Sequence, residues 1–325
     1  MSTLGSIRYL SKSDVEGCLP PLPLQIDLAE KALKALTVRD VEMPPKIGVH
    51  PRRSAFLHAM PAWFREEDIV GIKWIAGYPT NGPRNLASLA GLIVLNDAGT
   101  GYPKCVMDGT LITIYRTAAV SALGVRLFGP KKIHKVCLIG CGVQGRAHVQ
   151  IMATLLTSVE LNAYDSTHGK AEELAAWART LDGVVEARAA NSTAEAISDA
   201  DLVLTCALAT GGAKDVIPAS SLQSVKLLIP IDWSHLIGEE TAKESSWFVV
   251  DDRAQFEYVR SEGLGFVGYP DPSETMGEAL VRGFFPDMDR CVLVSNLGVA
   301  AVDLLFAAEV LRAGERNSCG TLLER

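Results

Sequence analysis

The chain has 325 residues, and because ordinary domains contain about 100 to 200 residues, this length favours two domains with separate cores. Hydrophobic residues make up 48% of the chain and charged residues 21%, a balance that excludes extensive disorder. The formal net charge of −7 opposes binding to nucleic acid or to an anionic membrane, so we expect neither as a partner.

The first third of the chain has the pattern of a small α+β domain. Residues 21–37 show the apolar spacing of an amphipathic helix. Separate apolar runs, bounded by glycine and proline, predict strands of a mixed sheet at residues 55–60, 69–75, 89–95 and 103–107. Residues 115–128 have a helical composition and are expected to connect this domain, residues 1–116, to the next one.

From residue 135 onward, short β-rich runs alternate with helical stretches. The pattern predicts a strand at 136–139, a helix after 142, a strand at 159–164 and a helix at 170–181, and the alternation continues through 184–187, 194–198, 202–206, 225–231 and 247–250. Strands joined by helices in this way form right-handed crossovers between parallel strands. We therefore expect an α/β fold with a doubly wound parallel (Rossmann) sheet at residues 117–300.

Cysteine usage and the apolar stretches point to a cytoplasmic protein. The seven cysteines are scattered, form no Cys-x-x-Cys pair and have no histidine at zinc-ligand spacing, so we expect reduced thiols and no metal site. The N-terminus lacks the apolar core of an export signal. The apolar stretch at 297–311 is interrupted by Asp303 and Glu309 and predicts a core helix rather than a membrane span.

The run Gly140-Cys141-Gly142-Val143-Gln144-Gly145 follows a predicted buried strand and opens a predicted helix. In this context, Gly140 permits a tight turn, Gly142 lets the backbone approach a pyrophosphate, and Gly145 allows close packing of helix and strand. Asp165 follows 20 residues after Gly145, where a carboxylate can accept the ribose hydroxyls and repel a 2′-phosphate. The sequence thus predicts NAD as cofactor.

Other interpretations of this segment are open. The glycines can form a strand-helix turn that binds no ligand, and Asp165 can be a helix N-cap or a solvated turn residue. His168 and Lys170 can moderate the repulsion of a 2′-phosphate, which leaves NADP as an alternative. The cofactor site that we predict contains Gly140, Gly142, Val143, Gln144, Gly145, Asp165, Thr117, Cys206, Ala207, Ile231, Ser295 and Asn296.

Four segments, spread from the first domain to the glycine run, carry a distinctive set of motifs. They are Gly-Ile-Lys at 71–73, Thr-Gly-Tyr-Pro at 100–103, Leu-Ile-Thr-Ile-Tyr-Arg-Thr-Ala-Ala at 111–119, and Gly-Cys-Gly-Val-Gln at 140–144. Together, these segments resemble the ornithine cyclodeaminase/mu-crystallin family. The resemblance implies a homodimer. It also implies that residues 1–116, completed by a C-terminal helix at 301–325, provide both the dimer contact and the substrate site.

The resemblance places Lys73 and Arg116 at the positions that hold the substrate carboxylate, with Lys46 where many members have arginine. The chemistry agrees, because a planar guanidinium can bind a carboxylate with two hydrogen bonds and a nearby ammonium can assist proton movement. The alternative for each residue is a solvated surface charge. Lys73, however, lies in an apolar run, where its charge needs a partner.

Asp232 ends a predicted strand, at the edge of the sheet that borders the ligand crevice in doubly wound folds. It matches the family's acidic residue that exchanges a proton at the substrate nitrogen, although a helix N-cap is the alternative. By resemblance, Ser88, Ser295 and Asn296 contact substrate or nicotinamide, and we add Met60 to the substrate site. Leu236 stands where cyclodeaminases have a lysine.

His58 departs from the pattern of ornithine cyclodeaminase, which has a glutamate that pairs with the distal ammonium of its substrate. Histidine cannot provide that anion. We therefore expect a substrate with a neutral or acidic side chain, for which Lys46, Arg52, Arg53 and Arg84 are available cations. The alternative is a packed histidine bonded to the backbone.

We thus expect an NAD(H)-dependent imino-acid reductase or amino-acid dehydrogenase acting on a small 2-imino acid, for example iminosuccinate, a ketimine or an alanine-type substrate. The first alternative is an ornithine cyclodeaminase, which converts ornithine to proline and ammonia. The second belongs to another class, a mu-crystallin-like protein that binds a ligand together with NAD(P).

Overall fold

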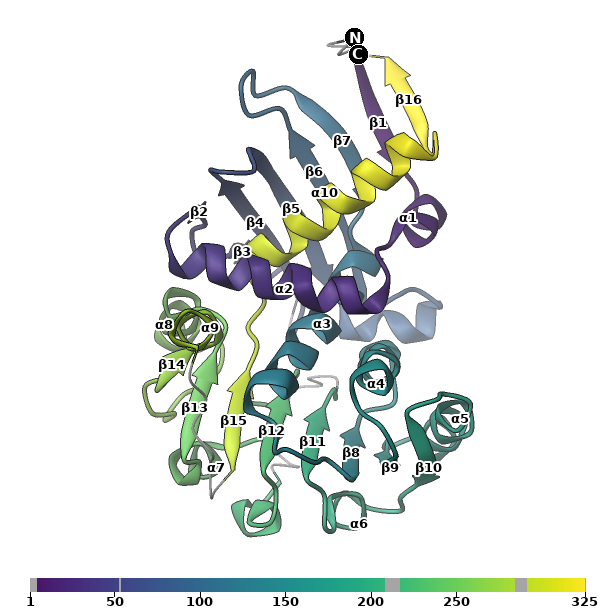
Figure 1. Ribbon diagram of the computed structural model, residues 1–325, viewed down its shortest axis with the longest axis vertical. Helices are drawn as coiled ribbons and strands as arrows, with labels where there is room; N and C mark the ends of the chain where they lie inside the picture. The colour runs from purple at the N-terminus through teal and green to yellow at the C-terminus, as the bar shows by residue number, and fades with distance from the viewer. Residues whose placement is uncertain (1–4, 53, 208–216, 284–290, 325) are drawn as a thin grey trace. The chain divides into compact units, whose positions relative to one another are not determined.

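The computed structural model describes residues 5–52, 54–207, 217–283 and 291–324 (Figure 1). The chain forms two compact units, Met1–Arg116 with Val299–Arg325, and Thr117–Gly298. Helix α3 (Thr110–Phe128) begins in the first unit and ends in the second. Its length and hydropathy would suit a membrane span, but 72% of its apolar stretch is buried within the protein, as in a core helix.

The first unit is an eight-stranded mixed sheet with helices on one face. Its sheet has the order β16-β1-β7-β6-β5-β4-β2, and β3 pairs with β4. The elements are β1 (Ser6–Leu10), α1 (Lys12–Cys18), α2 (Leu22–Thr37), β2 (Val41–Glu42), β3 (Ile47–Val49), β4 (Phe56–Phe64), β5 (Ile69–Gly77), the 3-10 helix η1 (Pro79–Arg84), β6 (Leu89–Asn96), β7 (Pro103–Asp108), α10 (Ala300–Arg316) and β16 (Thr321–Glu324).

Strand alternation gives this sheet two different faces. Helix α10 packs on β4, β5 and β6 and against α2, and covers the face that carries Met60, Lys73 and Ile93 (Figure 1). The opposite face presents Trp74 and Leu92, which are direct neighbours across β5 and β6 and are both 44% exposed. The first face is therefore a core, and the second is an apolar surface.

The second unit is an eight-stranded sheet in which all the strand pairs are parallel. Its elements are β8 (Lys135–Ile139), α4 (Val143–Leu155), β9 (Val159–Tyr164), α5 (His168–Ala178), β10 (Val184–Ala189), α6 (Thr193–Ile197), β11 (Leu202–Thr205), η2 (Ala219–Leu222), β12 (Leu227–Pro230), α7 (Glu239–Glu244), β13 (Trp247–Val250), α8 (Arg253–Ser261), β14 (Glu274–Thr275), α9 (Met276–Arg282) and β15 (Val292–Ser295).

The strand order is β10-β9-β8-β11-β12-β15-β13-β14, so the chain winds outward from β8 first to one side and then to the other. This confirms the expected doubly wound fold. The order reverses between β8 and β11, and ligands of such sheets bind beyond the carboxyl ends of the strands at this point. Gly140, Cys206, Ile231 and Asn296 all follow the carboxyl ends of strands in this sheet.

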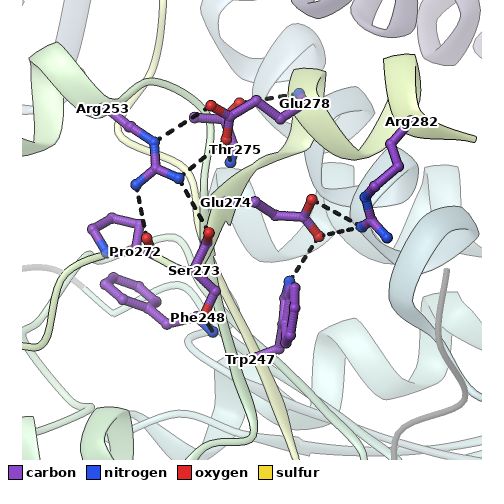
Figure 2. Close-up of polar contacts among 9 residues, drawn as sticks. All are labelled: Trp247, Phe248, Arg253, Pro272, Ser273, Glu274, Thr275, Glu278 and Arg282. Atoms are coloured by element: carbon purple, nitrogen blue, oxygen red, sulfur yellow. Dashed lines mark hydrogen bonds and ion pairs between the residues drawn. The ribbon is translucent and has the colours of Figure 1, made fainter. Parts of the chain in front are cut away.

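The short edge strand β14 is held in place by side chains (Figure 2). Glu274 accepts hydrogen bonds from Trp247 Nε1 at 2.7 Å and from Arg282 Nη2 at 2.7 and 2.9 Å. Arg253 donates to the carbonyls of Pro272 and Ser273 at 2.7 and 3.1 Å, and forms an ion pair with Glu278. These contacts close the end of the sheet farthest from β10.

Candidate functional site

The glycine turn after β8 has the geometry of a phosphate-binding loop. Gly140 has φ +98°, and a Cβ on it would lie 2.6 Å from the backbone of Cys206, so only glycine fits there. A Cβ on Gly145 would lie 2.2 Å from the Gly140 carbonyl oxygen, which explains the close approach of α4 to the turn. A Cβ on Gly142, by contrast, would meet nothing within 4 Å. The N-terminus of α4 is thus open at Gly142, where an anion can approach its N–H groups.

Asp165 follows β9 and braces this turn. Its Oδ2 accepts the backbone N–H of Cys141 at 2.9 Å, and its Oδ1 accepts that of Thr167 at 2.9 Å. The carboxylate therefore has a structural function: its bond to Thr167 agrees with the turn that the sequence left open as an alternative, whereas its bond to Cys141 was not expected. Each oxygen retains a further lone pair with which it can accept a ribose hydroxyl.

Three predicted cofactor residues carry buried oxygens without a hydrogen-bond partner among the described residues. They are Gln144 Oε1, Ser295 Oγ and Asn296 Oδ1. The Asn296 amide is oriented by its Nδ2, which donates to Ser121 Oγ at 3.3 Å, and Ser121 also bonds His148 Nε2 at 2.9 Å. Because buried polar atoms are rarely left unpaired, these oxygens fit a polar ligand such as a nicotinamide dinucleotide.

Asp232 lies just beyond β12 at the same edge of the sheet. Its Oδ1 accepts the Thr205 hydroxyl at 2.9 Å and its Oδ2 accepts the Ala207 N–H at 3.1 Å. Burial raises the pKa of its carboxyl to about 6, although these hydrogen bonds oppose the shift. A carboxyl with this pKa can both give and take a proton near neutral pH.

The remaining cofactor positions are Val143, Thr117, Cys206, Ala207 and Ile231. Val143 is 65% exposed at the first turn of α4, and Thr117 is buried in α3. The backbone N–H of Cys206 donates to Ile139 at 2.7 Å, and that of Ile231 donates to Thr205 at 2.8 Å. The first bond joins the ends of β11 and β8 at the switch point, and the second joins the ends of β12 and β11 beside it.

In the first unit, Lys73 and Arg116 share one buried carboxylate. Lys73 Nζ lies 2.6 Å from Asp303 Oδ2, and Arg116 Nε lies 3.0 Å from Asp303 Oδ1. The Lys73 and Asp303 side chains are 1% and 0% exposed. Burial lowers the pKa of Lys73 to about 8, against the attraction of Asp303. Two cations with one anion leave an excess of one positive charge in this buried cluster.

The sequence interpretation missed Asp303 as a site residue and regarded it as an interruption of an apolar helix. An acidic residue at the buried face of an otherwise apolar helix is itself a signal, because such a charge requires partners. The partners come from β5 and α3, so only the tertiary structure identifies them.

His58 lies on β4, on the same face of the sheet as Lys73. Its ring stacks on Phe56 with the centroids 4.3 Å apart. Burial, followed by the charges of Lys46, His50 and Lys73, lowers the pKa of His58 to about 3. The imidazole is therefore neutral at physiological pH, in surroundings that already repel another cation.

Lys46 and Met60 are buried in the same unit, 7% and 4% exposed, and Met60 pairs directly with Lys73 across β4 and β5. Ser88 precedes β6, and its carbonyl accepts the N–H of Tyr78 at 2.7 Å. Its contact with substrate remains a prediction. Leu236 is buried in the apolar core of the second unit, where its side chain packs against other hydrophobic residues.

Of the additional cations named from the sequence, Arg52 and Arg84 lie at the surface rather than in this cluster. Arg52 is exposed and donates to the carbonyl of Pro51 at 2.7 Å, and Arg84 is exposed on η1. Arg53 lies outside the described residues. Lys46 is thus the member of this group that is buried near His58.

Comparisons with known proteins agree on one family. The sequence pattern of the ornithine cyclodeaminase/mu-crystallin family matches residues 9–223. The nodulation efficiency protein NfeD of Rhizobium meliloti is 33% identical over 98% of this chain and 99% of its own length. The ketimine reductase mu-crystallin of Mus musculus is 27% identical over 89% of each chain.

Solved structures give the same fold. The Δ1-pyrroline-2-carboxylate reductase of Thermococcus litoralis, solved with NADH and L-proline, has a TM-score of 0.85 at 22% identity and covers 97% of this chain and 99% of its own. Since the family pattern spans well over half of the sequence, the chain belongs to the ornithine cyclodeaminase/mu-crystallin family.

Proposed function

We propose that the chain is an NAD(H)-dependent enzyme that interconverts a small 2-imino acid and the corresponding amino acid. The observation that carries this proposal is the buried pair Lys73 and Arg116, which share the single carboxylate of Asp303. An excess buried cation is costly unless an anion neutralises it. The α-carboxylate of an amino or imino acid supplies that anion and can receive two hydrogen bonds from a guanidinium.

The second unit supplies the cofactor and proton functions. The open N-terminus of α4 at Gly142 would hold the pyrophosphate, Asp165 the ribose, and the unpartnered oxygens of Ser295 and Asn296 the nicotinamide end. The bound dinucleotide supplies or accepts the hydride. Asp232 exchanges the proton on the substrate nitrogen, as its pKa of about 6 allows.

His58 determines which substrate side chains the proposed site accepts. The neutral imidazole and the nearby Lys46 and Lys73 disfavour a distal ammonium, because a cation there would lack a carboxylate partner. We therefore favour substrates with neutral or acidic side chains over ornithine and lysine. Ketimines, alanine-type imines and iminosuccinate have this character.

We also propose that two copies of the chain form a homodimer through the sheet of the first unit. Ile47, Ala59, Trp74 and Leu92 are direct neighbours across β3, β4, β5 and β6. Ile47, Trp74 and Leu92 are 62%, 44% and 44% exposed. An apolar row of this extent on one sheet face is typical of an interface.

A spectrophotometric screen tests the proposed function. The panel combines cyclic imines, iminosuccinate, and 2-oxo acids mixed with ammonia or methylamine, each with NADH and with NADPH. We expect oxidation of the reduced cofactor with at least one imine of neutral or acidic side chain. A folded protein that binds the cofactor but turns over no member of the panel would instead support a mu-crystallin-like binding function.

A further inference from the structure

Asp303 is the most deeply buried charged side chain of the candidate site, and nothing in the sequence pattern assigns it a function. It lies in the first turn of α10 between Val302 and Leu304 and is fully buried. An isolated carboxylate in such surroundings is strongly destabilising. Here, its two oxygens contact different cations, Lys73 on β5 and Arg116 on α3.

The arrangement is unlike a simple buried ion pair. A pair that serves stability alone needs one cation and one anion, whereas here one carboxylate faces two cations. Its contact with Arg116 is made through Nε, so the two terminal Nη groups of the guanidinium lie outside this hydrogen bond. A planar guanidinium held by Nε has a fixed orientation and presents its terminal nitrogens to a second carboxylate.

The ammonium of Lys73 depends on the same carboxylate for its charge. Burial has the largest effect on the pKa of Lys73 and lowers it, because the charged form loses its contact with water. Repulsion by Arg116 lowers this pKa further. Asp303 opposes both. Among the described residues, the charged or titratable groups that act on the neighbouring His58 are Lys46, His50 and Lys73, and none of them adds negative charge.

We propose that Asp303 is the positioning residue of the carboxylate site, which fixes Lys73 and Arg116 in place and keeps Lys73 protonated before the substrate arrives. This proposal rests on the proposed function for the identity of the incoming carboxylate. Asp303 does not contact the substrate in this account. It acts through the two cations, so its removal changes their charge and orientation together.

The test compares Asp303→Asn, Asp303→Glu and the control Glu309→Gln, which is on the same helix but pairs with Arg312 at the surface. Lysine labelled with ¹³C at Cε reports the titration of Lys73 by NMR, and Lys73→Met assigns its signal. In Asp303→Asn, the midpoint of this titration should fall by about one pH unit or more, because the nearby negative charge is lost. The control should titrate like the wild type.

Steady-state kinetics give the second measurement. With Asp303→Glu, the charge remains but the longer side chain displaces the cations, so KM for the imino acid should rise about tenfold or more at an unchanged Lys73 titration. The dissociation constant of NADH should not change in any variant. If Asp303→Asn does not fold, Asp303→Glu still tests whether the position of the carboxylate determines KM.

A wild-type Lys73 titration in Asp303→Asn, or a wild-type KM in Asp303→Glu, would overturn the positioning function. Failure of the proposed function gives a different result. In that case, the Lys73 midpoint still moves in Asp303→Asn, but no imino acid is reduced by the wild type.

Discussion

Lys73 and His58 lie on neighbouring strands and face the same side of the sheet, and burial lowers the pKa of both, but their charged neighbours differ. Lys73 has a carboxylate within 2.6 Å and keeps a pKa of about 8, whereas His58 has cations nearby and a pKa of about 3. At neutral pH, the site therefore contains charged lysine beside neutral histidine. We expect this combination to favour an anionic head group and to disfavour a cationic tail.

The substitution His58→Glu tests this selection. The new carboxylate should lower kcat/KM for an anionic imine by about tenfold or more through repulsion, and should permit some binding of ornithine. The measurement is product analysis by mass spectrometry after incubation with each substrate, and His58→Gln is the neutral control. Equal losses in the two variants would show that charge at this position is irrelevant.

The pH dependence of the two reaction directions should be opposite. If Asp232 is the acid in reduction, kcat/KM should fall as the pH rises through about 6 and its carboxyl ionises. If it is the base in oxidation, kcat/KM should rise through about 6, and should fall above about 8, where Lys73 loses its charge.

The control for this assignment is Asp232→Asn. The limb near pH 6 should disappear in both directions, and turnover should fall by about a hundredfold or more. Profiles are corrected for the titration of the imine itself. A limb near pH 6 that persists in the variant would exclude Asp232 as the proton-exchanging group.

At the scale of single residues, sequence motifs indicate which side chains belong to the candidate site, but not which side chains they contact. Lys73 and Arg116 lie in recognisable segments, and the structure places both beside one carboxylate. Asp303 was missed because it follows Arg116 by 187 residues and interrupts an apolar pattern that is explained by a core helix. A contact over such a distance leaves no trace in local spacing.

Among the helices and strands, those with a clear pattern in their own local sequence were predicted best. Strands β9 (Val159–Tyr164) and β13 (Trp247–Val250) were expected with these same bounds. β13 is a continuous apolar run, and β9 is a short β-rich run in which Glu160 and Asn162 alternate with apolar residues. Strands β1 and β16 were not expected. They pair with each other across nearly the whole chain, and β16 is exposed along its length, so it lacks a hydrophobic alternation.

Two glycine-to-alanine substitutions, with a third in α5 as control, separate the functions of the dinucleotide turn. Gly145→Ala should lower Tm by about 3 °C or more, because its Cβ would lie 2.2 Å from the Gly140 carbonyl oxygen. Gly142→Ala should leave Tm nearly unchanged, because its Cβ would meet no protein atom within 4 Å. It should weaken NADH binding by about tenfold or more, because the Cβ would fill the space proposed for the pyrophosphate.

Gly169→Ala in α5 is the matched control, because a Cβ there also meets nothing within 4 Å. It should change neither Tm nor the NADH dissociation constant, measured by calorimetry and by nicotinamide fluorescence. Unaltered NADH binding in Gly142→Ala would contradict the assignment of this position to the pyrophosphate.

For the molecule as a whole, the first unit is built from both ends of the chain. Helix α10 returns after the second unit, covers β4, β5 and β6, and brings Asp303 to Lys73. The proposed substrate site is thus complete only when residues 299–325 have folded onto residues 1–116, a consequence of nonlocal topology.

The proposed dimer can be tested by light scattering after size-exclusion chromatography. Trp74→Glu places a charge in the exposed apolar row and should convert the dimer to monomers. Val185→Glu is the matched control, since Val185 is 64% exposed on β10 of the second unit. A wild type that elutes as a single chain would contradict the homodimer.

The most direct test of the proposed function follows deuterium from NADH labelled at nicotinamide C4 into the product. With an active imine of neutral or acidic side chain, mass spectrometry should show one deuterium at the α-carbon of the amino acid, and one NADH should be consumed for each molecule formed. With ornithine and a catalytic amount of NAD, little proline should form. Efficient release of proline and ammonia from ornithine, without net consumption of the cofactor, would contradict the account and indicate a cyclodeaminase.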